Sequence, residues 1–339
     1  MAEAWFEKRE RGSGWGLRIG RTLALALGRR AGRALLWPIT AYFFCFLREG
    51  RVGLRRYYEA LEGHPPSVAA LFAHYLTFAR TILDRAYLLA RHPDAPPYDI
   101  RGFEAVSPFL GQGRGAVLLG AHLGSFDAAR AAASLRPDLK VQVIMNVGVS
   151  RKLNEALRVL DPGAQDSILS LGGAASLLRV KEILADGGLV GLMGDRPLGG
   201  ELTYEAEFLG RMARFPLGPL RLAATLQVPV FFFTALYRKA ASGACRYELV
   251  FEPLCGPAPE VALRGEWMRR LGERYVDTLQ AYCRAAPDNW FNFYDFWQAQ
   301  DVGPPRRATP GDGGPGRVGG RAPMERSDAP RDVGARGER

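Results

Sequence analysis

The sequence predicts an α/β fold, in which helices flank a mixed β-sheet in three layers and a membrane-associated helical region precedes them. From about residue 98, short apolar runs typical of buried strands alternate with longer helix-forming segments. Before residue 98 the pattern is helical and includes a basic, apolar stretch. A hydrophobic content of 47% in 339 residues is enough for a sizeable core.

The composition divides the chain into four regions. Residues 1–50 form a basic and apolar membrane-associated segment, and residues 51–97 form a helical region expected to pack on the core. Residues 98–300 are the α/β domain. Residues 301–339 are a tail rich in Gly, Pro and Arg, which cannot build a packed core, so we expect it to be disordered.

The amino-terminal region favours a helix or helical hairpin lying in the membrane interface. Residues 1–60 carry 12 Lys or Arg against 5 Glu, and residues 34–47 are almost uniformly apolar. Such a 14-residue run is too short to cross about 30 Å of hydrocarbon. A buried core helix is the first alternative. The second is a single span starting near Leu17, which would bury Arg29, Arg30 and Arg33.

After the amino-terminal region the sequence predicts one long helix, followed by strands and helices that alternate. Ser67 is expected to cap a helix over Val68–Leu89, and prolines between 93 and 97 end the helical region. Apolar runs predict strands at Ala116–Gly120, Val141–Val147, Ser167–Leu169, Leu189–Gly194, Val230–Tyr237 and Tyr247–Pro253. A polar link containing glycine joins the last two strands, which indicates an antiparallel pair. Helices are expected at Asp127–Ser134, Lys152–Leu160, Ala174–Ala185, Leu217–Leu226 and Leu263–Ala285.

Charge and cysteine content narrow the function classes. A net charge of +10 and a pI near 9.7 indicate an anionic partner, either nucleic acid or an acidic membrane surface. The four Cys and four His are scattered without metal-ligand spacing, so no zinc site is expected. The cysteines are interpreted as buried and reduced. His64, His74 and His92 are assigned structural roles.

The segment Gly120-Ala-His122-Leu-Gly-Ser-Phe-Asp127 is the strongest candidate for a catalytic site. It follows an apolar strand, and open α/β sheets place ligand sites at the carboxyl ends of their strands. Five residues advance about 500° on a helix, so His122 and Asp127 share a side only if a turn separates them. Such a turn lets Asp127 orient His122 as a general base. Chance spacing is the alternative interpretation.

Two kinds of motif are missing from the sequence: those that bind nucleotides and those that present a nucleophilic serine. The Gly-rich residues 111–115 precede a strand instead of following it, and they lack dinucleotide-binding spacing, so they are interpreted as a turn. The sequence has no Walker A motif and no G-x-S-x-G elbow, and Ser125 is therefore not assigned as a nucleophile.

Four later motifs extend the pattern. They are Gly191-Leu-Met-Gly-Asp-Arg-Pro197, Phe208-Leu-Gly-Arg-Met-Ala-Arg-Phe-Pro-Leu-Gly-Pro219, Val228-Pro-Val230 and Ala286-Pro-Asp-Asn-Trp-Phe-Asn-Phe-Tyr-Asp-Phe-Trp297. In this order and spacing, from about Trp37 to Trp297, the chain resembles the bacterial lipid A biosynthesis (lauroyl/myristoyl) acyltransferase family. That family lies within the lysophospholipid/glycerolipid acyltransferase superfamily.

The resemblance implies transfer of a fatty acyl group from acyl carrier protein or acyl-CoA to a hydroxyl of a lipid or glycolipid acceptor. It implies His122 as the general base and Asp127 as its partner, with no metal or redox cofactor. It also implies a location on the cytoplasmic side of the inner membrane. The oxyanion and any acceptor phosphate need positive or N–H donors. The candidate substrate-binding residues are Ser125, Arg196, Gly210, Arg211 and Arg214. The alternative interpretation of the three arginines is that they are ordinary solvated side chains.

Two departures leave the acceptor open. Many members of the family read His-x-Gly-Asn-Trp-Glu at the first motif, where this chain has Ser125, Phe126 and Asp127. The aromatic ending resembles relatives found beside fatty-acid-type and aryl polyene biosynthetic genes. Competing functions are hydrolysis of an acyl thioester and nonenzymatic binding of membranes or nucleic acid. No nucleic-acid motif supports a nucleic-acid partner.

Overall fold

The computed structural model describes residues 14–110, 114–126, 128, 140–145, 168–170, 174–197, 201–240 and 244–297. Several predicted segments therefore lie wholly or largely outside the described residues. They are the turn at 111–115, the helices Asp127–Ser134 and Lys152–Leu160, and the tail at 301–339.

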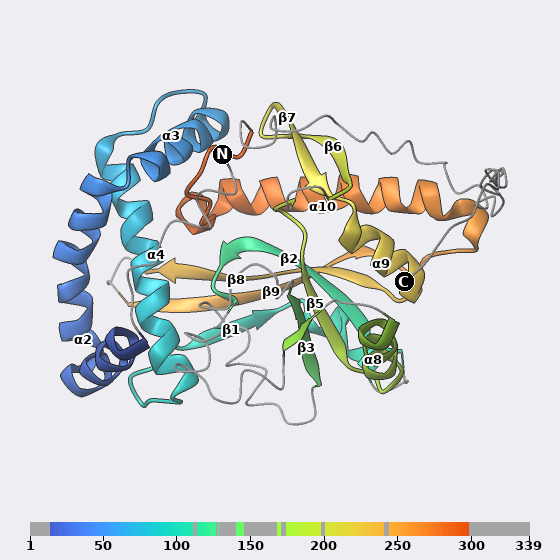
Figure 1. Ribbon diagram of the computed structural model, residues 1–339, viewed down its shortest axis with the longest axis horizontal. Helices are drawn as coiled ribbons and strands as arrows, with labels where there is room; N and C mark the ends of the chain where they lie inside the picture. The colour runs from blue at the N-terminus through green and yellow to red at the C-terminus, as the bar shows by residue number, and fades with distance from the viewer. Residues whose placement is uncertain are drawn as a thin grey trace, which may run out of the picture.

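A seven-stranded mixed sheet forms the centre of the molecule (Figure 1). All neighbouring strands are parallel except β8 and β9, which form the predicted antiparallel pair. The edge strand β1 was not predicted, because the first of its four residues is half-buried and the other three are exposed. In spatial order the strands are β1 (Tyr98–Arg101), β9 (Cys245–Cys255), β8 (Val230–Lys239), β2 (Ala116–Gly124), β5 (Leu189–Met193), β3 (Val141–Met145) and β4 (Ile168–Ser170).

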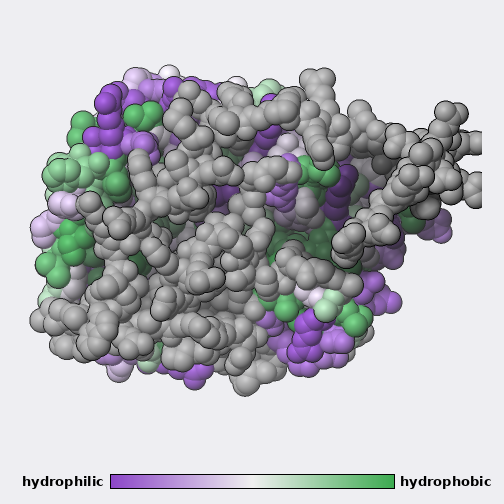
Figure 2. Space-filling model, in the orientation of Figure 1, coloured by the Kyte–Doolittle hydropathy of each residue, from purple (hydrophilic) through white to green (hydrophobic). Residues whose placement is uncertain are grey.

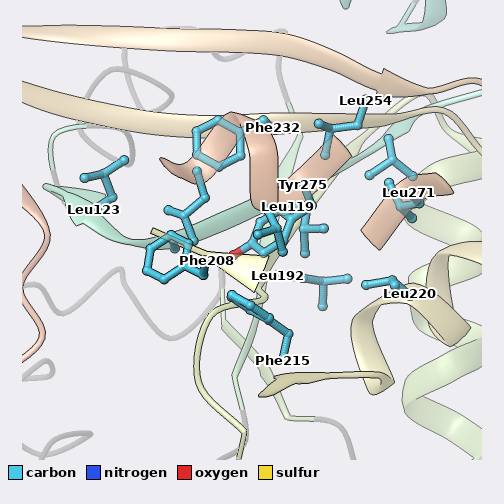
Figure 3. Packing of buried hydrophobic residues seen from close by; sticks show 14 of the residues in the cluster. Leu119, Leu123, Leu192, Phe208, Phe215, Leu220, Phe232, Leu254, Leu271 and Tyr275 are labelled. Atoms are coloured by element: carbon cyan, nitrogen blue, oxygen red, sulfur yellow. The ribbon is translucent and has the colours of Figure 1, made fainter. Parts of the chain in front are cut away.

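Hydrophobic clusters cover both faces of this sheet, which agrees with the prediction of a central mixed sheet flanked by helices. Because side chains alternate along a strand, Val117 and Leu119 of β2 join one cluster and Ala116 and Leu118 join the other. The first cluster, part of which Figure 3 shows, contains Tyr275 and other residues of the helix across that face. The helices contributing to it are α8 (Ala174–Ala185), α9 (Gly218–Leu226) and α10 (Arg264–Ala285), all close to their predicted bounds.

A separate antiparallel hairpin, β6 (Thr203–Phe208) and β7 (Arg211–Pro216), was not predicted. Its two-residue turn places both Leu209 and Gly210 at positive φ, which a right-handed hairpin twist favours. Leucine is unusual in that position, so the turn lacks the Asn-Gly or Asp-Gly signal by which such hairpins are recognised. Phe208 buries its ring against Trp290 and thereby ties the hairpin to the carboxyl-terminal segment.

Among the described residues, three helices precede the sheet and pack at one end of it (Figure 1). They are α2 (Gly14–Phe46), α3 (Arg48–Glu62) and α4 (Val68–Leu89). The backbone of α2 leaves helical geometry at Gly28, and the helix contains Pro38. The Ser67 Oγ accepts a hydrogen bond from the Ala70 N–H at 3.1 Å, which confirms the predicted cap of α4.

Of the arginines at 29, 30 and 33 in α2, the first and the last make contacts inside the protein. Arg29 Nε lies 2.7 Å from Oδ1 of Asp84, a fully buried residue of α4. Arg29 and Arg33 both donate to the Sγ of Cys245, and Arg33 also donates to the Tyr237 hydroxyl. A buried charge is tolerated only when it is paired, so these contacts fix α2 against α4 and the sheet.

The carboxyl-terminal half of α2 exposes large apolar side chains. No helix among the described residues is both long and apolar enough to span a membrane. We call the exposed set the α2 apolar face, and Figure 2 shows hydrophobic residues along the edge where α2 lies. Its members are Leu35, Trp37, Ile39, Tyr42, Phe43 and Phe46, together with Leu47 just beyond the helix, and each is at least 40% exposed.

The cysteines are all free, but they are not all buried as predicted. Cys45 is exposed near the end of α2, and Cys255, the last residue of β9, is half-buried and packs against the first cluster. Among the described residues no group of His, Cys, Asp and Glu is placed to hold a metal ion.

Candidate active site

His122 lies near the carboxyl end of β2, as the sequence predicts for a ligand site. The parallel register of β2 and β5 pairs Gly120 with Met193, and the Gly194 N–H donates to the Gly120 carbonyl at 2.9 Å. Continuing that register by two residues brings His122 level with Asp195. The site therefore arises where two adjacent strands end.

His122 and Asp195 form a close pair. The His122 Nδ1 is 2.9 Å from Asp195 Oδ1, and the His122 backbone N–H donates to Oδ2 at 3.1 Å. The Trp290 indole N–H also points to Oδ2, at 3.4 Å. Because a carboxylate only accepts hydrogen bonds, this contact fits an imidazole that has its proton on Nδ1 and a free Nε2. The Asp195 side chain is fully buried, whereas 36% of the His122 side chain is exposed.

The electrostatics keep the pair in the form that base catalysis needs. Burial lowers the pKa of His122, the Arg196 charge lowers it further, and the Asp195 carboxylate opposes both. Burial alone would raise the pKa of Asp195, but attraction to a protonated His122, the hydrogen bonds from His122 and the charge of Arg196 together lower it to about 2. At neutral pH the pair is therefore a carboxylate beside a neutral imidazole.

The backbone after His122 makes a sharp departure from the sheet. Gly124 has a φ of +76°, and a Cβ there would lie 2.1 Å from the Ala235 carbonyl oxygen, so only glycine fits. The Ser125 N–H donates to that same oxygen at 2.7 Å. The Ser125 Oγ accepts from the Ala128 N–H at 3.3 Å, which is the contact of a helix cap.

The carboxyl-terminal aromatic segment, residues 289–297, lies against this site. Its Phe291 N–H donates to the His122 carbonyl at 2.8 Å, and Trp290 forms a β-bridge with Leu123. Arg196 donates to the Phe291 carbonyl at 2.7 Å and stacks over the Tyr294 ring. Through these contacts the segment holds the backbone of His122 in place.

The remaining predicted residues fall into two places. Arg196 lies beside the His122 pair, with its Nε buried and without a hydrogen-bond partner. Gly210, Arg211 and Arg214 lie on the β6–β7 hairpin, where Gly210 forms the turn. Arg211 stacks on the Trp297 ring, and Arg214 is 3.5 Å from Glu205 across the hairpin. Asp127 lies outside the described residues, so its pairing with His122 stays a prediction.

Comparison with known families decides the assignment of the chain. The family model for bacterial lipid A biosynthesis acyltransferases matches residues 62–298. The chain belongs to the bacterial lipid A biosynthesis acyltransferase family. This lipid A acyltransferase family member carries its whole described site, from His122 to Trp297, inside the matched region. No curated protein sequence matches it. Membership implies an acyltransferase that acts on lipid A-like acceptors.

The carboxylate beside Nδ1 was missed by the sequence analysis. Asp195 was quoted only as part of the Gly-Asp-Arg-Pro motif, with no role of its own. The signal was nevertheless available, because Ala116–Gly120 and Leu189–Gly194 were both predicted strands and each is soon followed by a titratable residue. What the sequence lacked was the information that these two strands are neighbours.

Proposed function

We propose that this chain transfers a fatty acyl group from an acyl thioester, on acyl carrier protein or coenzyme A, to a hydroxyl of a lipid or glycolipid. The observation that carries the proposal is His122, whose Nδ1 is held by a buried carboxylate while part of the ring reaches solvent. Family membership supplies the reaction class. Lipid A is one acceptor in this class, and the unusual first motif leaves other lipids open.

The reaction follows from the basic Nε2 of His122. Nε2 takes the proton of the acceptor hydroxyl as its oxygen attacks the thioester carbonyl carbon. The tetrahedral oxyanion collapses, the carbon–sulfur bond breaks, and the imidazolium returns the proton to the leaving thiolate. The products are an ester and a free thiol. The thioester itself supplies the driving force, so the step uses no resident metal or redox cofactor.

Arg196 is the candidate donor for developing negative charge. It lies close enough to His122 to lower its pKa, and its buried Nε has no protein partner. A guanidinium in this position suits an oxyanion or an acceptor phosphate. Arg211 and Arg214 are kept as phosphate candidates on the hairpin, and Ser125 and Gly210 as residues that shape the backbone around the substrate.

The α2 apolar face supports docking on the cytoplasmic surface of the inner membrane. Its exposed aromatic and aliphatic side chains are typical of a helix that lies in the lipid interface. The exposed Arg48 and Arg55 of α3 follow directly and favour anionic headgroups. We therefore propose an enzyme that binds the bilayer through α2 and takes its acceptor from that surface.

Product analysis tests this proposal. The purified full chain is incubated with an acyl carrier protein bearing a labelled acyl group and with bacterial glycolipid in detergent. Wild type is expected to give labelled lipid, and so is His64→Ala, which changes an exposed histidine. His122→Ala is expected to give none. Labelled free fatty acid as the sole product would mean a hydrolase, and intact thioester with wild type would contradict both enzyme functions.

A further inference from the structure

We infer that Asp195 is the positioning residue that fixes the tautomer of His122. The inference rests on the proposed function, because a fixed tautomer matters only if His122 acts as the base. It differs from the pairing expected within the H-x4-D motif, because Asp195 lies just beyond the end of the neighbouring strand β5, 73 positions further along the chain.

The geometry around Asp195 fixes the role of each oxygen. Oδ2 receives two N–H donors, from the His122 backbone and from the Trp290 indole. Oδ1 faces Nδ1 of the His122 ring at 2.9 Å. Both donors to Oδ2 belong to groups that cannot accept a hydrogen bond in return, so the carboxylate has one orientation and the imidazole proton has one acceptor.

This arrangement makes asparagine an informative replacement. In Asp195→Asn the amide oxygen must occupy the Oδ2 position, because two N–H donors point there. The amide NH2 then faces Nδ1 and donates to it. His122 is forced to carry its proton on Nε2, where it can no longer accept one from a hydroxyl. The change removes a charge and inverts the tautomer while keeping the shape of the side chain.

A second carboxylate does not share this role, because Nδ1 carries a single proton. Asp195 already accepts that proton over a short distance from a fully buried position. Asp127 is the competing residue, and the two assignments predict opposite results for the same pair of variants. If Asp195 orients the ring, Asp127→Asn leaves the tautomer unchanged.

The first readout is nitrogen NMR of full-length protein labelled in its four histidines, with His122→Ala identifying the His122 signals. Wild type and Asp127→Asn are expected to show Nδ1 protonated and Nε2 free. Asp195→Asn is expected to show the reverse. Asp186→Asn is the matched control, since Asp186 is an exposed carboxylate paired with Lys140. This readout does not depend on the activity, so it stands or fails separately from the proposed function.

The second readout is the pH profile of acyl transfer. Asp195→Asn is expected to lower kcat by on the order of 10³- to 10⁴-fold, as inversion of a catalytic histidine tautomer does elsewhere, with KM little changed. Because the carboxylate raises the pKa of His122, its removal is expected to move the acid limb of the residual activity to lower pH. Asp186→Asn is expected to match wild type in both respects.

Two results would overturn the inference. One is a wild-type His122 that carries its proton on Nε2. The other is a tautomer that inverts in Asp127→Asn but not in Asp195→Asn, which would assign the positioning role to Asp127. If Asp195→Asn does not fold, the inference is tested by the NMR spectra of wild type and Asp127→Asn alone. In both proteins the Nδ1 of His122 must then be protonated.

Discussion

His122 and Asp195 stand side by side because each lies two residues beyond a registered pair, Gly120 and Met193, on adjacent parallel strands. Their relative position is therefore set by the backbone hydrogen bonds of the sheet and not by a flexible loop. The carboxyl-terminal segment adds a second constraint, since Trp290 and Phe291 contact the carboxylate and the histidine carbonyl. A site fixed by a sheet and a buried segment is well suited to orient a base.

Removing the indole donor to Asp195 is expected to impair catalysis beyond its effect on folding. Trp290→Phe deletes one of the two N–H groups that hold Oδ2, so we expect kcat to fall by about tenfold, the loss that corresponds to one hydrogen bond to a charged group. The matched control is Trp267→Phe, which also removes a buried indole donor, here to the Gly256 carbonyl. Steady-state kinetics measures the loss of catalysis in each variant, and thermal melts measure the loss of stability. Equal kcat in both variants would contradict a role for the Trp290 N–H.

Two glycines with the same φ of +76° offer a matched pair. At Gly210 a Cβ meets nothing within 4 Å, so Gly210→Ala is expected to cost about 1 kcal/mol, the strain of left-handed backbone alone. At Gly124 the Cβ collides with the Ala235 carbonyl, so Gly124→Ala is expected to cost several times more and to displace His122. Urea unfolding and acyl transfer measure both. Similar losses for the two variants would show that close packing at Gly124 is unimportant.

The buried His74 of α4 is expected to make stability fall in mild acid. Its Nε2 is 3.1 Å from the Trp290 carbonyl, and burial lowers its pKa to about 4. At pH values between about 6.5, the ordinary pKa of histidine, and about 4, the unfolded chain binds a proton at His74 that the folded chain does not bind. The folded state therefore loses stability as the pH falls through this range. The loss attributable to this group near pH 5 is about 2 kcal/mol.

Urea unfolding at about pH 7.5 and pH 5 checks this expectation in wild type and His74→Gln. Glutamine keeps an N–H donor for the Trp290 carbonyl but does not titrate. The variant is expected to be less stable at neutral pH and to lose about 2 kcal/mol less than wild type on acidification. An identical pH dependence in both proteins would show that His74 does not titrate against folding.

Charges on the α2 apolar face are expected to weaken membrane binding. Phe43 and Phe46 are exposed, and burying each ring in lipid is worth about 1.5–3 kcal/mol. Phe43→Glu with Phe46→Glu is therefore expected to reduce flotation with phosphatidylethanolamine–phosphatidylglycerol vesicles by well over tenfold. The control is Val261→Glu with Leu263→Glu, which charges two exposed apolar residues before α10. Equal binding by both double variants would place the docking surface elsewhere.

The elements predicted best from the sequence are those with the strongest apolar pattern. The strands β2, β5, β8 and β9 and the helices α4 and α10 appear near their predicted bounds, because each buries a continuous or periodic apolar side. The edge strand β1 and the β6–β7 hairpin were missed, since one is largely exposed and the other alternates with charged residues around a Leu-Gly turn.

The site was predicted in part for the same physical reason. His122 and Arg196 each follow a strong strand, so their position at the carboxyl edge of the sheet could be inferred from the chain. The pairing of His122 with Asp195 depends on which strands are neighbours, and no local pattern encodes that. The contact of Trp290 with Asp195 likewise joins segments 95 positions apart and arises only from tertiary packing.

The central claim, that this chain acylates a lipid through His122, is tested most directly by mass spectrometry of lipid extracts from cells that express wild type or His122→Ala. The account predicts a lipid species heavier by one acyl group with wild type alone, whose fragments identify the acceptor. Equal amounts of both variant proteins in the membrane fraction are the control. The same lipid species in both extracts would contradict the assignment of His122 as the base.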